Sequence, residues 1–455
     1  MERQTWSNKL TYILTVAGAT IGFGCTWRFP YLVGENGGGA YVFVFCVAMI
    51  ALGIPMILVE NVIGRRALKN SVDAFGVPKL NGEKISQKWK IVGIMGLIGA
   101  FGILAYYMVL GGWVLTYIIN IINGNFNLSA PITDPKFTEN FYNANIENNP
   151  LWIGIYTFIF VAINWYILKK GIIDGIEKFV KFLMPALFLC FMAVIVTNLT
   201  LPSATAGVGF YLSIDFAKIT PKLLIDVLGQ VFFALSLGFG VMITLSSFLD
   251  KEENLIQTAT LTAVINTIIA VLAGFMIFPA LFSVGLEPTK GTRLVFESLP
   301  IAFSYMPFGN LIGVVFLSIL LIAALTTSLT IYQVLINYVE EKFNLTTIKS
   351  TNIVLLAIFV LGNIPCILSS NILGDVQILS RSIFDAFDFV SANIFFVLTA
   401  LMCSLYVGWV LGDDAVHELT NGGKQGAGLA KIWLVYVRFV LPLIIAVVFV
   451  YGIFG

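Results

Sequence analysis

Charged residues, cysteine and histidine are scarce in this sequence. Charged side chains make up 11% of the 455 residues, and there are five cysteines, one histidine and a net charge of +1. A nearly neutral chain offers no basic field to a polynucleotide, which excludes a nucleic-acid partner. The cysteines lie inside apolar stretches without paired spacing, which argues against a disulfide framework or a zinc site. They are Cys25, Cys46, Cys190, Cys366 and Cys403.

The single histidine, His417, stands in a polar segment beside Asp413, Asp414 and Glu418. We expect a solvated loop residue there, with no role in carrying protons. No pair of nucleophile and base and no cluster of metal ligands favours an enzyme. The N-terminal residues lack a cationic region followed by a short apolar core and a cleavage site, so we expect the first apolar run to be retained.

Hydrophobic residues, by contrast, make up 58% of the sequence, and its mean hydropathy is +0.92. So much apolar surface with so little charge belongs in a lipid bilayer. Apolar stretches recur from Leu10 to Phe454, and each meets the length of about 20 residues that a helix needs to cross the hydrocarbon. Alternating barrel strands would not give such long runs. The sequence therefore predicts an all-α polytopic protein of the cytoplasmic (plasma) membrane.

We predict eleven membrane helices in one transporter domain that covers residues 1–455. They are expected at residues 8–32, 40–66, 89–121, 151–168, 176–200, 223–249, 256–286, 309–340, 351–369, 383–412 and 430–454. Lysine and arginine gather in the second and fourth connections, which the positive-inside rule places in the cytoplasm. The third connection is acidic and is expected outside. With an odd number of helices, the N-terminus is then cytoplasmic and the C-terminus extracellular or periplasmic.

A Gly-Phe-Gly motif occurs twice, at Gly22–Gly24 in the first predicted helix and at Gly238–Gly240 in the sixth. Five helices separate the two motifs, and because five is odd, the second unit enters the membrane with the opposite orientation. This spacing predicts an inverted repeat, with residues 8–200 and 223–412 as its halves and the helix at 430–454 outside it.

Paired glycines destabilise a helix and leave backbone groups without partners, which hydrocarbon tolerates only where the chain lines a cavity or is buried in protein. The N-terminus of a half-helix presents amide groups to an anion, and freed carbonyls can coordinate a cation. We therefore expect helices 1 and 6 to be unwound at mid-membrane around a site for an ion and a ligand. The alternative is that these glycines only allow close helix packing.

Further motifs accompany the two breaks across nearly the whole chain. They are Trp6, Trp27-Arg28-Phe29-Pro30, Glu35 to Ala40, Gly53-Ile54-Pro55 with Glu60, Tyr106-Tyr107, Gln230 to Phe233, Leu325 to Ser328, and Asp385 with Asp388. Together with the breaks, they closely resemble the neurotransmitter:sodium symporters, especially the bacterial leucine-transporter-like members. The resemblance implies sodium-coupled amino-acid transport by alternating access. The departure is the number of helices, since many members have twelve.

The resemblance also implies one complete sodium site, between helices 1 and 8. Its ligands would be the carbonyls of Gly18, Ile21 and Ala323 and the hydroxyls of Thr326 and Thr327. Neutral oxygens without a carboxylate suit a small monovalent cation. The alternative is that the two threonines only bond back to their own helix.

A second implied sodium site is depleted. Its remaining members are Thr20, Asn266 and the carboxylate of the bound substrate, whereas Cys25 and Ala234 stand where the family carries Asn and Thr. Because a thiol and a methyl are poor ligands for a hard cation, we expect this site to be empty or much weakened, which leaves one coupled sodium ion. The chloride site of the animal members is also missing, with Phe45, Ala234 and Ala270 at its positions, so we expect transport that is independent of chloride.

Substrate, gates and one structural contact are also implied by the resemblance. Gly22 leaves the space where amine transporters carry an Asp, so the substrate is expected to bring its own carboxylate, and the mostly apolar pocket favours an aliphatic or aromatic amino acid. The implied substrate residues are Gly22, Phe23, Gly24, Ile103, Tyr107, Phe233, Ser236, Phe239, Thr327, Thr330 and Ile331. The implied gates are Arg28 with Asp388 outside, and Arg3 with Glu341 under Trp6 inside. Glu60 is expected to accept hydrogen bonds from freed amides of helix 6. A sodium-independent exchanger and a membrane-embedded amino-acid receptor are the alternatives on the same fold.

Overall fold

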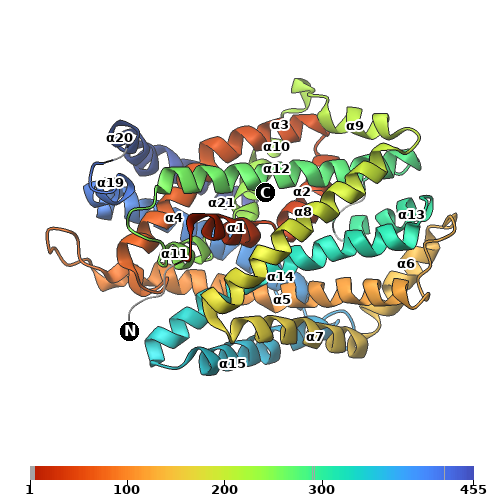
Figure 1. Ribbon diagram of the computed structural model, residues 1–455, viewed down its shortest axis with the longest axis horizontal. Coiled ribbons are helices and arrows are strands. Elements are labelled where there is room, and N and C mark those ends of the chain that lie inside the picture. The colour runs from red at the N-terminus through yellow and green to blue at the C-terminus, as the bar shows by residue number, and fades with distance from the viewer. Residues whose placement is uncertain (1–5, 289–290, 292, 425, 455) are drawn as a thin grey trace.

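The computed structural model describes residues 6–288, 291, 293–424 and 426–454. In this part of the chain, the secondary structure is helical, apart from one isolated β-bridge between Ile378 and Arg381. The longest helices, including α5 and α12, run along the long axis of the molecule (Figure 1). The predicted all-α fold is confirmed.

Nine helical spans among the described residues are long and apolar enough to cross a membrane. They are α3 (Gly39–Ala48) with η2 (Met49–Gly53) and α4 (Ile54–Ala67); η4 (Gln87–Trp89) with α5 (Lys90–Ile122); α7 (Pro150–Leu168); η6 (Ile172–Glu177) with α8 (Lys178–Leu199); α12 (Leu255–Ser283); α14 (Gly309–Phe343); α15 (Thr347–Ile358) with η9 (Phe359–Asn363) and α16 (Ile364–Leu368); α17 (Ile383–Phe389) with η10 (Val390–Phe396), α18 (Val397–Leu405) and η11 (Tyr406–Leu411); and α20 (Ala427–Val435) with η12 (Tyr436–Val440) and α21 (Leu441–Phe454).

The two remaining predicted helices are broken where the sequence places the Gly-Phe-Gly motifs. The first consists of α1 (Lys9–Thr20), η1 (Gly24–Arg28) and α2 (Phe29–Glu35), and its two parts are bent by 55°. The second consists of α10 (Pro221–Ala234) and α11 (Val241–Ser246), with a non-helical segment at 235–240. By length alone, α10 and α11 do not count as crossing helices, which is why the structure shows up to ten spans where eleven are predicted.

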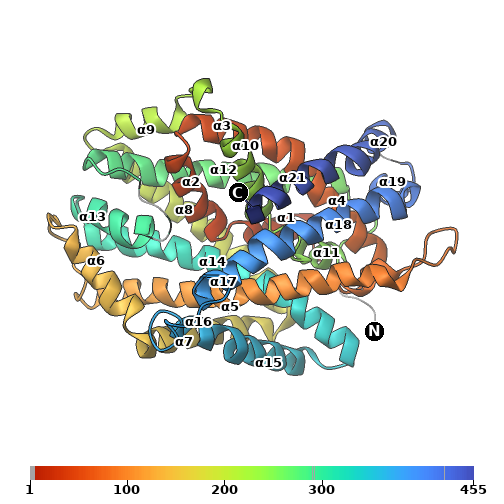
Figure 2. The same ribbon diagram turned by 180° about the vertical axis from the view of Figure 1, so that it is seen from behind.

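Short helices that the sequence did not predict lie in the connections. They are η3 (Asp73–Gly76), α6 (Lys136–Tyr142), η5 (Asn143–Glu147), α9 (Ala204–Leu212), η7 (Phe216–Lys218), η8 (Leu294–Ser298), α13 (Leu299–Ser304) and α19 (Asp413–Leu419). Figures 1 and 2 show α6, α9 and α13 at one end of the molecule and α19 and α20 at the other. The loop predicted around His417 is wrong, because this residue lies exposed in the last turn of α19. Two acidic residues in the first turn of α19 favour that helix.

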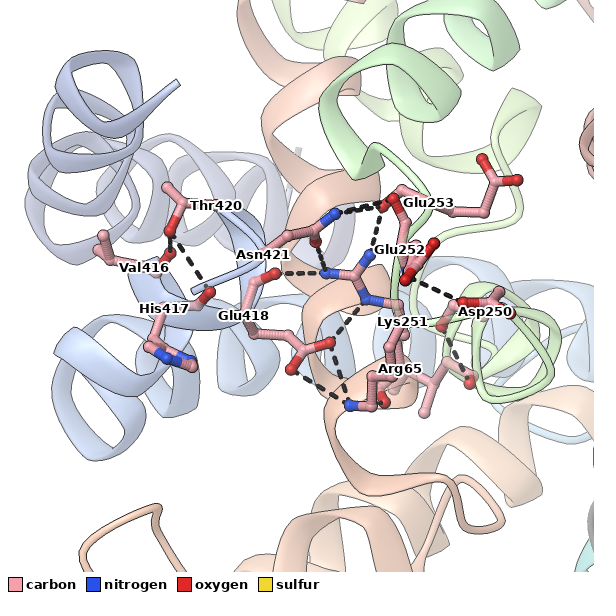
Figure 3. A network of polar contacts seen from close by, with 12 residues as sticks. Arg65, Asp250, Lys251, Glu252, Glu253, Val416, His417, Glu418, Thr420 and Asn421 are labelled. Atoms are coloured by element: carbon pink, nitrogen blue, oxygen red, sulfur yellow. Dashed lines mark hydrogen bonds and ion pairs between the residues drawn. The ribbon is translucent and has the colours of Figure 1, made fainter. Parts of the chain in front are cut away.

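A cluster of polar groups around the buried Arg65 ties the end of α4 to α19 (Figure 3). Arg65 is 1% exposed, and its guanidinium donates to Glu418 Oε1 at 2.6 Å, Asn421 Oδ1 at 2.7 Å and Glu253 O at 2.5 Å. Lys251 Nζ donates to Arg65 O at 2.7 Å and lies 3.3 Å from Glu418 Oε1. Three segments that are far apart in the sequence therefore meet at one end of the molecule.

Candidate site for ion and substrate binding

The first break begins where α1 ends at Thr20. Ile21, the C-cap residue, has φ −92° and ψ 57°, and its amide still donates to Ala17 O at 2.9 Å. The next helical turn starts again only beyond Gly22, whose carbonyl accepts the amides of Cys25 and Thr26. The break therefore frees backbone groups in the middle of a buried segment, as the paired glycines predict.

The second break requires residues with positive φ. Gly238 and Gly240 have φ of 83° and 77°, and a Cβ on Gly238 would overlap the carbonyl oxygen of Phe396. Ser236 also adopts a positive φ, 51°, which is uncommon for a residue with a side chain. Its hydroxyl donates to Ala19 O at 3.0 Å, so the strained turn directly contacts α1. The two breaks thus face one another.

A carboxylate from α4 supports the second break. Glu60 is fully buried, and its Oε1 accepts the amide of Gly238 at 2.7 Å. Gln230 contributes a similar contact to the first break, where its Nε2 donates to Gly24 O at 2.7 Å. Gln230 belongs to one of the sequence motifs, but its contact with Gly24 was not predicted.

A narrow cavity lies between the two breaks. Its lining consists of Thr20, Gly22, Gly24, Ile103, Tyr107, Phe233, Ser236, Phe239, Thr327 and Ile331. All predicted substrate residues line it except Phe23 and Thr330, and Thr20 is an addition. The Phe23 amide donates to Tyr107 Oη at 3.2 Å, and the buried Thr330 hydroxyl donates to Thr327 O at 2.8 Å.

One end of this cavity is polar and the other is apolar. A Cβ added to Gly22 would come within 2.5 Å of Tyr107 Oη and 2.7 Å of Thr327 Oγ1, so two hydroxyls meet at this glycine. The remaining walls are mostly aliphatic and aromatic side chains. Such a cavity can orient a small amphiphilic ligand by its polar group.

Oxygen atoms gather where α1 passes α14. Thr327 Oγ1 donates to Gly18 O at 3.2 Å, and Thr326 Oγ1 lies 3.1 Å from Ala323 O. A Cβ on Gly18 would lie 3.2 Å from Thr326 Cβ, so the glycine permits the close approach of the two helices. Four of the five predicted sodium ligands are linked by these contacts; the fifth, Ile21, is buried at the end of α1.

The residues of the depleted site also lie together. Asn266 from α12 donates through Nδ2 to Thr20 O at 3.1 Å, to Ala234 O at 3.1 Å and to Cys25 Sγ at 3.3 Å. Asn266 Oδ1 is buried and has no hydrogen-bond partner among the residues that the structure describes. The amide nitrogen therefore occupies the centre of this group.

The predicted outer gate is not a direct ion pair in this structure. The guanidinium of Arg28 lies 4.4 Å from the centroid of the Phe233 ring, and the charge of Asp388 lies near enough to interact with it. Tyr106 lies near enough to Asp388 to interact with its charge, but among the described residues its buried hydroxyl has no hydrogen-bond partner.

The predicted inner gate falls partly outside the described residues, because Arg3 belongs to the N-terminal segment that the structure leaves out. Glu341 Oε2 accepts the backbone amide of Asn70 at 2.9 Å and its side-chain amide at 2.8 Å. Trp6 is buried, and its indole N–H donates to Leu245 O at 3.1 Å at the end of α11. Asn70 is a partner that sequence reasoning missed, because nothing in its own neighbourhood marks it.

Comparisons with known proteins agree with this geometry. Residues 3–151 and 149–455 match the profile of a family described as the sodium:neurotransmitter symporter family. A sodium-dependent transporter of Haemophilus influenzae is 59% identical over 100% of this chain and 99% of its own length, and YhdH of Bacillus subtilis, also a sodium-dependent transporter, is 34% identical over 98% and 96%. The solved structure of MhsT in complex with L-phenylalanine has a TM-score of 0.86 and 34% identity, and covers 99% of this chain and 100% of that one. These relatives are transporters, not enzymes. The chain belongs to the sodium:neurotransmitter symporter family and is a sodium-dependent, multi-pass membrane transporter.

Proposed function

We propose that this protein couples sodium to the uptake of a small aliphatic or aromatic amino acid by alternating access. The cavity between the two breaks supports this proposal by its chemistry, because the polar end at Gly22 and Tyr107 suits a carboxylate and the walls at Ile103 and Phe239 suit an apolar side chain. Its structural neighbour MhsT was solved with L-phenylalanine, an amino acid of this kind.

The coupling ion binds, in this proposal, between α1 and α14. Gly18, Ala323, Thr326 and Thr327 bring carbonyl and hydroxyl oxygens together there, and none of them carries a charge that would favour a divalent cation. A sodium ion would replace the hydrogen bonds that the two threonines now make to these carbonyls. The ion would then hold the end of α1 against α14.

Transport is proposed to be independent of chloride. The positions at which an anion would need hydroxyl donors are Phe45, Ala234 and Ala270, which are all buried and have no donor side chain. We also propose that residues 8–200 and 223–412 form inverted repeats, that Arg28 with Asp388 closes the outer path, and that the N-terminus is cytoplasmic. The basic second and fourth connections support this orientation.

A two-step experiment tests the proposed function. Thermal unfolding of the purified protein is first measured with the common amino acids, in sodium and in choline, because a ligand stabilises the state that it binds. The best ligand is then used, radiolabelled, in counterflow across proteoliposomes. Sodium-dependent counterflow is expected. Counterflow that persists in choline would instead show an exchanger, and stabilisation without counterflow would show a receptor.

A further inference from the structure

Three acceptors converge on one nitrogen atom beside the substrate cavity. Asn266 Nδ2 lies 3.1 Å from Thr20 O, 3.1 Å from Ala234 O and 3.3 Å from Cys25 Sγ. All four residues are buried, with Asn266 and Cys25 at 0% exposure. No solvent can therefore share these contacts.

The acceptors determine which kind of atom can lie between them. Two carbonyl oxygens that approach the same atom need a donor or a cation there, because a third oxygen would repel both. In this structure the donor is the nitrogen of Asn266, which is the end of the amide that faces Thr20 and Ala234. The opposite end, Oδ1, is left buried without a hydrogen-bond partner, which is unfavourable unless the contacts of the nitrogen outweigh it.

The side chains around this nitrogen cannot build a cation site. Cys25 and Ala234 contribute a thiol and a methyl group, and the thiol itself donates to Thr20 O at 3.3 Å. With the Asn266 nitrogen in the centre, no side-chain oxygen of these residues faces it. A hard cation would require the amide to turn its oxygen inward, and that oxygen would be the only protein side-chain ligand beside the backbone carbonyls.

We infer that the side-chain amide of Asn266 permanently takes the place of a second sodium ion and joins the end of α1 to the end of α10. This inference rests on the proposed function and adds to it, because it makes Asn266 a positioning residue and not an ion ligand. The link between the breaks then forms without an ion, and it adds no driving force, since a side chain is not released to the cytoplasm.

The inference also accounts for the apolar surroundings of this point. A neutral amide needs no compensating charge, so its surroundings can be wholly apolar. Phe45 and Ala270, both at 0% exposure, offer neither a charge nor a hydroxyl.

Sodium titration of thermal stability tests the inference directly, without any transport measurement. The unfolding temperature is followed against sodium concentration for the unaltered protein and for Asn266→Leu, which has a similar shape but no amide. In both proteins, we expect the rise of the unfolding temperature with sodium to fit the binding of about one sodium ion per protein. The unfolding temperature of the variant should be lower at every sodium concentration. A dependence of about two sodium ions that falls to one in Asn266→Leu would overturn the inference.

A variant designed to bind a second sodium ion provides the second test of the inference. The double variant Cys25→Asn with Ala234→Thr supplies two oxygen side chains and is expected to raise the dependence to about two sodium ions, as the amide turns its oxygen inward. Cys190→Ser with Ala193→Thr on α8, away from the cavity, is the matched control and should stay at one. If sodium stabilises none of these proteins, the proposed function fails; if the unaltered protein shows two, only the inference fails.

Discussion

Gly22 decides the size of the polar end of the cavity. Its missing side chain leaves room between Tyr107 Oη and Thr327 Oγ1, where a Cβ would come within 2.5 and 2.7 Å. Gly22→Ala is therefore expected to weaken substrate binding by about 10- to 100-fold, since the methyl group would push away the two hydroxyls of the polar end. Isothermal titration calorimetry with the amino acid identified in the thermal screen measures the dissociation constant. Gly154→Ala on α7, where a Cβ meets nothing within 4 Å, should bind normally.

Removal of the Thr326 hydroxyl tests the proposed sodium site. Thr326→Val keeps the shape of the side chain and removes the oxygen, so the sodium concentration for half-maximal stabilisation should rise by about tenfold or more. Ser318→Ala on the same helix removes a hydroxyl that only bonds back to Val314 O, and it serves as the control. Equal sodium dependence in both variants would mean that Thr326 only bonds back to α14.

The motifs predicted these residues better than they predicted their partners. The glycine, threonine and tyrosine positions could be taken from the sequence because the resemblance to the symporter family implies them. The contact of Glu341 with Asn70 and the proximity of Asp388 to Tyr106 depend on which helices pack together, and this is set by distant parts of the chain. Sequence spacing alone does not contain that information.

At the scale of elements, the break between α10 and α11 depends on α4. Glu60 accepts the Gly238 amide at 2.7 Å inside a fully buried environment. Glu60→Leu leaves that amide unpaired and is expected to lower the free energy of unfolding by about 1–3 kcal/mol. Glu60→Gln keeps an acceptor oxygen and should lower the free energy of unfolding much less. Thermal unfolding in detergent compares the two, and equal losses would contradict the hydrogen-bonded role.

The short helix α19 is held by Arg65. Seven residues give too few turns for an apolar face to appear in the sequence, which is why this segment was predicted as a loop. Arg65→Leu leaves Glu418 with Lys251 alone and should destabilise the protein by about 3–5 kcal/mol. Lys79→Leu breaks the more exposed pair with Glu83 and should cost at most about 1 kcal/mol. Chemical unfolding of both variants checks the difference.

For the whole molecule, the sequence predicted the all-helical membrane fold because long apolar runs leave few other structures in a bilayer. It did not predict the π-helical turns within the spans, such as η2 and η10, since these depend on packing against neighbouring helices. The short helices of the connections were missed because they have too few turns to show a helical pattern in the sequence. The division into inverted repeats and the orientation of the termini stay predictions, and they depend on charge and spacing alone.

The most direct measurement of the central claim is the coupling ratio of sodium to substrate in proteoliposomes. With the membrane potential clamped at zero, a sodium gradient of about tenfold should concentrate the amino acid by about tenfold if one ion moves with each substrate. One sodium site between α1 and α14 predicts this result. Accumulation of about a hundredfold would show two coupled ions, and no accumulation at all would contradict sodium-driven symport.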